Sequence, residues 1–298
     1  RIRGETTLSL DEASLLCKEY DMSLDSILQA GKNEITFHFE PLDENSFTFM
    51  DYLGSILSSM EMIDSAEEKE VIYMANEIPL FHLLNSPALA AFKLFFWQKT
   101  ILDFSVFRDA KFKLFQKDDQ VSDISRKLRA LYCKTPSVEV YNSETIDTTL
   151  KQIEYYYETG YFEVADEALV LLDHLSVLVD HIKAQCELGF KFNHDKEGKT
   201  PEYVPYQKEG NYTVYHNEVL HSDNHILVRM GDRHLTFLTS NGVNVLYTKS
   251  VYFHDQAYRV IDNLKKKSTL ISGTSEKERN KVFLNYHKKI EKLKNKLQ

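Results

Sequence analysis

The sequence contains few residues that break or cross-link a chain: among 298 residues there are 10 glycines, 6 prolines and 3 cysteines. So little glycine and proline argues against a disordered chain, a collagen-like repeat and a turn-dense all-β sandwich. The cysteines, Cys17, Cys133 and Cys186, are odd in number and far apart, so they form neither a CxxC pair nor a disulfide framework. A reducing cytoplasm is the simplest location for such a chain.

Long apolar runs and short catalytic motifs are also missing. No apolar stretch reaches the roughly 18–20 residues of a membrane span, because Lys93, Gln98 and Lys99 interrupt the most apolar run, 89–102. With no secretory leader pattern either, we expect no membrane partner. The sequence lacks the P-loop, GxGxxG, HExxH and GxSxG motifs, so no cofactor, metal or catalytic residue is predicted.

Charge is distributed unevenly along the chain. The formal net charge is −9, yet residues 264–298 hold eleven basic and three acidic residues, a net +8 that leaves −17 for the rest. Such an acidic body would repel a polyphosphate, which makes it a poor platform for nucleic acid. We interpret the basic tail as the solvated face of a helix, with DNA contact as the alternative.

The hydrophobic pattern predicts an α+β fold in which helix predominates. Helices are expected over 9–28 (two short ones), 46–62, 88–103, 121–132, 145–159, 162–187, 252–264 and 275–297, and strands over 35–39, 71–78, 212–217, 225–230, 233–238 and 268–272. Gly231-Asp232 predicts the turn of an antiparallel hairpin. Gly189 is expected to cap the C-terminus of the helix before it.

The polar stretch 194–210 is the best internal boundary. It divides the chain into an N-terminal segment 1–32, a mainly helical region 33–193 and a smaller α+β region 194–298. The alternative is that 33–298 forms one sensor and oligomerisation domain.

The N-terminal segment carries an ordered pattern. Ser9 and Glu12 have the spacing of a capping box, and Ala13, Leu16, Cys17 and Tyr20 then lie on one face of a helix. Arg3-Gly4, Ser9-Leu10, Glu12 and Ser23-Leu24-Asp25 with Ile27-Leu28 resemble the second half of a phage-repressor-like helix-turn-helix domain (XRE family, Cro/cI type). The resemblance covers about 28 of the 298 residues, and the first two helices and most of the recognition helix are absent.

The resemblance implies a transcriptional regulator truncated at its N-terminus, of the kind found in Bacteroidetes with a long C-terminal region. Its DNA-binding residues would be Arg1 and Arg3, at the end of the recognition helix, and Thr6 and Thr7 in the following loop. These positions suit phosphate contacts better than base reading. A solvated chain end is the alternative interpretation.

Three other clusters have stronger structural than functional interpretations. Asp173-His174 and Asp180-His181 repeat seven residues apart, too far for one metal, and are expected at the polar edge of a buried helix. His216, His221 and His225, with Glu218 and Asp223, are expected in a polar turn. Phe92, Phe95, Phe96 and Trp97, with Tyr155, Tyr156 and Tyr157, are expected in the core, with an aromatic ligand pocket as the alternative.

A hydroxyl-rich junction is the candidate site for an anionic ligand. It comprises Ser268, Ser272, Thr274, Ser275 and Arg279, where a strand is expected to meet a helix N-terminus. The simpler interpretation is that Ser275 only caps its helix, with Glu278 completing a capping box.

These patterns favour a cytoplasmic transcriptional regulator, represented mainly by its sensor and dimerisation region. Its partners would be duplex DNA, bound through the complete N-terminal module, a second copy in a homodimer, and a small-molecule effector. The alternatives are an enzyme with its active site in 212–275 and a protein-interaction module.

Overall fold

The computed structural model describes residues 8–20, 24, 34–45, 47–114, 119–193, 211–218 and 224–298. Its helices are α1 (Leu10–Glu19), α3 (Phe49–Ser65), α4 (Leu80–Leu83), α5 (Pro87–Phe96), α6 (Asp119–Lys134), α7 (Asp147–Glu158), α8 (Glu167–Leu188), α9 (Val251–Lys265) and α10 (Glu276–Leu297). A π-helical turn, η1 (Trp97–Ile101), extends α5, and a 3-10 turn, η2 (Ser105–Phe107), follows it. The predicted α+β class with predominant helix is confirmed.

The strands form one seven-stranded mixed sheet in the order β6-β5-β4-β1-β2-β3-β7. They are β1 (Lys69–Met74), β2 (Ser137–Tyr141), β3 (Tyr212–His216), β4 (His225–Met230), β5 (Arg233–Ser240), β6 (Asn244–Thr248) and β7 (Thr269–Leu270). The central strands β1, β2 and β3 are parallel, and the remaining pairs are antiparallel. The sheet therefore joins strands from both sides of the boundary predicted at 194.

Most predicted elements are present, but three strand predictions need correction. The sequence did not indicate β2 or β6. In place of the strand expected over 35–39, only His38 forms an isolated bridge, with Tyr247 of β6. The predicted hairpin of β4 and β5 is confirmed, with Met230 paired to Arg233 across the turn.

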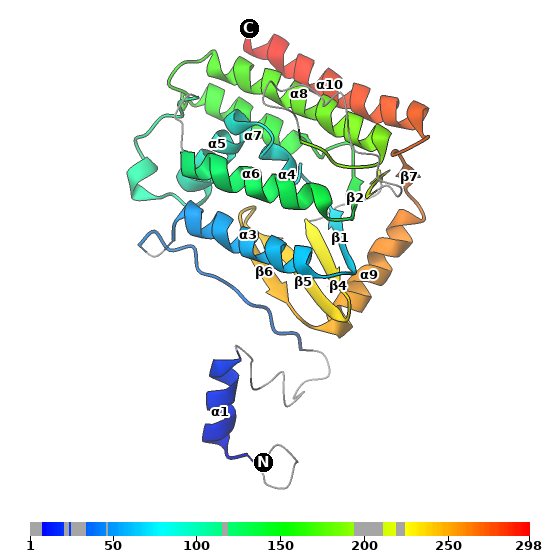
Figure 1. The fold of residues 1–298 in the computed structure, drawn as a ribbon. Coiled ribbons are helices and arrows are strands. Elements are labelled where there is room, and N and C mark those ends of the chain that lie inside the picture. The colour runs from blue at the N-terminus through cyan, green and yellow to red at the C-terminus, as the bar shows by residue number, and fades with distance from the viewer. Residues whose placement is uncertain are drawn as a thin grey trace.

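The two faces of the sheet are covered unequally (Figure 1). Alternate residues of β1, such as Ile72 and Met74, pack with Leu227 and with Ile261 of α9 on one face. On the other face Val71 and Tyr73 belong to the main core, which includes side chains from α3, α5, α6, α7, α8 and α10. This two-residue alternation assigns each strand residue to the α9 face or to the main core.

Helices α8 and α10 lie side by side (Figure 1) and are joined by two polar contacts at equal spacing. Asp173 pairs with Lys294 at 2.8 Å, and Asp180 pairs with His287 at 2.9 Å. Asp173 and Asp180 are seven residues, or two helical turns, apart on α8, and His287 and Lys294 are the same distance apart on α10. The two helices run in opposite chain directions. Asp173 and Asp180 thus lie at a polar helix edge, as predicted, and pair with part of the basic tail. His181 was predicted at the same edge but is buried.

Helix ends confirm one of the two predicted capping boxes. Ser9 and Glu12 form both bonds of the box at α1. Ser275 precedes α10 but makes no side-chain capping bond, so the second capping box is wrong. Gly189 ends α8 in the left-handed region, with φ 73°, and donates to the Gln185 carbonyl, as expected of a C-terminal glycine.

Candidate functional site: a cavity between α3 and the sheet

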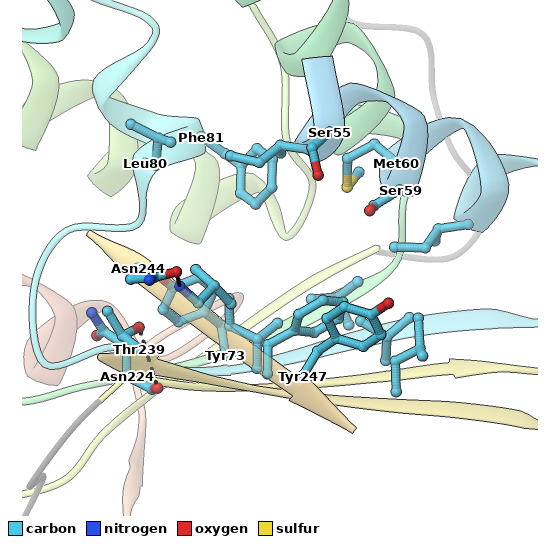
Figure 2. Close-up of a pocket in the computed structure, with 18 of the residues that line it drawn as sticks. Ser55, Ser59, Met60, Tyr73, Leu80, Phe81, Asn224, Thr239, Asn244 and Tyr247 are labelled. Carbon is cyan, nitrogen blue, oxygen red and sulfur yellow. Dashed lines mark hydrogen bonds between the residues drawn. The ribbon is translucent and has the colours of Figure 1, made fainter. Parts of the chain in front are cut away.

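A cavity of about 790 Å³ separates α3 from the main-core face of β1, β4, β5 and β6. Figure 2 shows Ser55, Ser59 and Met60 of α3, with Leu80 and Phe81 of α4, facing Tyr73 and Tyr247 of the sheet. Most of the lining is apolar and comes from two sides: Ile56, Met60 and Ile63 of α3, and Val71, Ile226, Val228, Met230, Leu235 and Phe237 of the sheet. Its size and composition are those of protein sites for drug-sized ligands.

The packing of α3 accounts for the space. Helix α3 packs against α6 more closely than against any strand. The strand residues that face it, such as Val228 and Leu235, are buried and line the cavity. They are not covered by a close-packed helix. Because protein interiors normally leave few voids larger than a water molecule, a space of this size is a feature to be explained.

One end of the cavity is polar. Lys93 of α5 donates to Glu77 at 2.6 Å and to Gln152 at 3.2 Å, and only 3% of the Lys93 side chain is exposed. The ammonium also lies 5.4 Å from the ring centre of Trp97, the first residue of the π-helical turn. Tyr52 of α3 donates to the Val243 carbonyl at 3.1 Å.

We call the opposite end the mouth, because Met62 at the end of α3 and Asp232 and Arg233 at the β4–β5 turn are exposed there. Exposed lining residues also occur elsewhere around the cavity: Glu40, Ser55, Gly242, Lys249 and Val251. In the antiparallel register this turn lies beside Lys69, the first residue of β1, whereas Tyr73 lies near the end of that strand. The cavity thus follows α3 from an exposed mouth to the polar end.

A second polar cluster, the Glu139 network, lies next to the cavity on the same face of the sheet. Glu139 of β2 is fully buried, and its carboxylate accepts from Tyr132, from Tyr141 at 2.5 Å and from Tyr212 at 2.9 Å. His82 of α4 completes the network with Nε2 3.0 Å from Glu139 Oε1. One carboxylate is thereby held by side chains from α4, α6, β2 and β3.

The network stabilises the ionised carboxylate. Burial alone would raise the pKa of Glu139, but the charge and hydrogen bond of His82 and the bonds from Tyr132 and Tyr141 lower it to about 2. Lys191 lies over the rings of Tyr132 and Tyr212 and donates to the Thr135 carbonyl at 2.7 Å. Its burial lowers the pKa of the Lys191 ammonium to about 8, against the opposing attraction of Glu139.

The Glu139 network has little room for a substrate. A space of about 10 Å³ beside it is lined by His82, Cys133 and Lys191, among others, and holds roughly one water molecule. Phe81 borders both this space and the large cavity, and its ring stacks on Tyr132 at 4.3 Å. We therefore interpret the network as a rigid support behind the cavity.

The predicted anion site at 268–279 has structural partners instead. Arg279 is 3% exposed, and its guanidinium donates to the carbonyls of Ile271 at 3.3 Å and Gly273 at 2.7 Å. Ser272 accepts from the Val214 amide, and Ser268 accepts from Asn217 and donates to the Leu264 carbonyl. Thr274 is exposed and Ser275 is half-buried.

The other sequence candidates are placed as follows. Arg1, Arg3, Thr6 and Thr7 lie outside the described residues, as do His221 and Asp223. Leu16 is 43% exposed and Cys17 is the buried residue of α1, so the predicted apolar face is mostly open in this chain. Phe92, Phe96 and Tyr156 are core, as predicted, whereas Trp97 also lines the cavity. Tyr155 was expected in the core but is 44% exposed.

Sequence reasoning missed the residues of both sites. Lys93 was noted only as a break in an apolar run, although a lysine amid apolar helix residues is a signal for a buried, paired ammonium. Glu139 gave no such signal, because two of its four partners, His82 and Tyr212, are distant in sequence.

Comparisons with known proteins give no information about the site, so its interpretation depends on its geometry. No family model matches the chain, and no curated protein or solved structure matches it. No helix among the described residues is long and apolar enough to cross a membrane. Within the same residues, no group of three or more His, Cys, Asp or Glu side chains is arranged to hold a metal ion.

Proposed function

We propose that this chain is the ligand-binding region of a cytoplasmic, DNA-binding transcriptional regulator, and that the cavity beside α3 binds its small-molecule effector. The observation that carries the proposal is the cavity: about 790 Å³, mainly apolar, with a few charged groups in its lining. This combination is typical of ligand sites. The DNA-binding part rests on the resemblance of residues 1–28 to the second half of a phage-repressor-like module.

Helix α3 is the element through which a ligand would act. It forms one wall of the cavity and is the first long helix after the N-terminal segment. A ligand that binds one position of α3 better than another shifts the population toward that position. The partners in this proposal are duplex DNA, bound through the complete module, and a second copy of the chain.

Binding to the cavity is tested with Nile red, an uncharged dye whose emission rises in apolar surroundings. Ser59 lines the cavity, and Ser58, the preceding residue of α3, is exposed and does not. The dye should bind the natural chain and the Ser58→Trp control, and Ser59→Trp should reduce binding at least tenfold because its indole fills the space. Equal binding by both variants would contradict the assignment.

DNA recognition is tested with the product of the complete reading frame. Selection from random duplexes at physiological salt should yield a palindromic sequence, because a symmetric dimer binds two half-sites. Light scattering after size exclusion should give twice the chain mass. A monomer that selects no sequence would reject the regulator and leave only a ligand-binding protein.

A further inference from the structure

The polar end of the cavity consists of Tyr52, Tyr73, Glu77, Lys93 and Trp97. Its charges balance, because the Lys93 ammonium and the Glu77 carboxylate are 2.6 Å apart. Lys93 also has Gln152 as an acceptor, and the Tyr52 hydroxyl donates to the Val243 carbonyl. The cationic donor at this end is thus already engaged.

Two polar atoms at this end are left without a partner among the described residues. Tyr73 is 6% exposed and lines the cavity, and its hydroxyl makes no hydrogen bond to the described part of the chain. Glu77 binds Lys93 through Oε2, which leaves Oε1 without a donor there. Tyr73 and Glu77 both line the cavity, and after burial itself the Glu77 charge is the next cause that raises the pKa of the Tyr73 phenol.

Resting on the proposed function, we infer that the ligand is a neutral amphiphile: an apolar body ending in a hydroxyl that bridges Tyr73 and Glu77. A hydroxyl both donates and accepts, so it can donate to Glu77 Oε1 and accept from the Tyr73 phenol. The apolar body lies along Met60, Val228 and the rest of the lining toward the mouth.

Charged headgroups of either sign fit this end less well. A ligand carboxylate would lie beside Glu77 while Lys93 is already neutralised, and a ligand ammonium would lie beside Lys93. In each case a like charge lies within a few ångströms in a poorly solvated space, and the headgroup loses its hydration without a free counter-ion. The balanced ion pair therefore selects for a neutral group.

The test measures displacement of Nile red by three probes of equal chain length: decan-1-ol, decanoate and decylammonium. We expect decan-1-ol to bind at least tenfold more tightly than either ion. Tyr73→Phe should weaken decan-1-ol about three- to tenfold, the worth of one hydrogen bond, and leave Nile red unchanged. Ser58→Ala, which removes a hydroxyl from an exposed α3 residue outside the lining, is the matched control and should leave the preference intact.

Glu77→Gln provides the sharper arm, because it frees the Lys93 ammonium and should move the preference from decan-1-ol to decanoate. If this variant does not fold, Tyr73→Phe still decides. The inference would be overturned if the natural chain bound decanoate most tightly, or if Tyr73→Phe left the affinity for decan-1-ol unchanged. The proposed function would stand in either case. Failure of Nile red to bind the natural chain would remove both.

Discussion

Tyr73 and Glu139 are register partners in the neighbouring parallel strands β1 and β2, so their side chains share one face of the sheet. Tyr73 lines the large cavity, while Glu139 is sealed in its own network. Phe81 and His82 repeat this division on α4, since Phe81 lines the cavity and His82 binds Glu139. The two sites therefore share a strand pair and a helix, and the network fixes the wall of the cavity.

The Glu139 network should make the fold sensitive to acid. Because the pKa of Glu139 is about 2 in the folded chain and near 4.3 in an unfolded one, its contribution is complete above about pH 4.5 and is lost as the pH falls toward 2. Glu139→Gln should lower the free energy of unfolding by about 3–5 kcal/mol at pH 7, because it breaks a buried ionic network.

Urea unfolding followed by circular dichroism, from pH 7 down to pH 3, measures this effect. The difference between natural chain and Glu139→Gln should shrink below pH 4.5. Glu163→Gln, a change at an exposed residue outside the network, is the control and should differ little at any pH. A pH-independent difference would show that shape, and not ionisation, is what Glu139 supplies.

A helix-capping argument would assign Ser275 a larger contribution to the free energy of unfolding than Arg279. We expect the reverse. Arg279→Met removes the donor to two carbonyls of the turn before α10 and should cost about 2–4 kcal/mol of unfolding free energy. Ser275→Ala should change it by less than about 0.5 kcal/mol, because the hydroxyl makes no capping bond.

Thr48→Ala is the reference for a working cap in the same denaturation experiment. Thr48 accepts from the Asp51 amide at 3.1 Å at the start of α3, so its loss should cost about 1 kcal/mol. Should Ser275→Ala cost as much as Thr48→Ala, the capping box predicted from the sequence would be restored.

The ion pairs between α8 and α10 should specify register and contribute little stability. The carboxylates of Asp173 and Asp180 are largely exposed, so Asp173→Asn and Asp180→Asn should each cost under about 1 kcal/mol at low salt and less in 1 M NaCl. Leu175→Ala, on the buried face of α8, should cost about 2–5 kcal/mol at either salt concentration. Thermal unfolding at the two salt concentrations separates these effects.

Local patterns predicted most of the fold, because helices such as α6 to α10 and strands such as β4 and β5 each bury one face with a regular period. Strand β2 was missed since Ser137 and Glu139 occupy its buried positions, where the pattern expects apolar residues. Ser137 and Glu139 can be buried there because other elements supply polar partners. A short stretch of sequence around β2 does not show which residues those partners are. The strand expected over 35–39 has the right alternation, yet only His38 finds a partner strand.

The cavity was out of reach for a related reason. Periodicity shows that Ile56, Val228 and Leu235 face inward, but the same residues would line a close-packed core. Whether α3 lies against the sheet or at a distance from it depends on its packing with α6, which is a contact between segments some 70 residues apart. The charged residue Lys93 was the one local sign that this part of the interior is polar.

Finally, the chain should bind duplex DNA weakly and without sequence preference. Lys289, Lys294 and Lys296 of α10 pair with acidic residues of α7 and α8, so the charge of the basic tail is partly neutralised. Four exposed lysines, Lys277, Lys281, Lys288 and Lys292, lie on one stripe of α10 and are the candidates in this helix for phosphate contacts. Anisotropy of labelled duplexes between 50 and 200 mM salt should give a shallow slope of log affinity against log salt, because few counter-ions are released. Changing the four stripe lysines to Gln should flatten the slope further, whereas sequence-selective nanomolar binding by the natural chain would contradict the prediction.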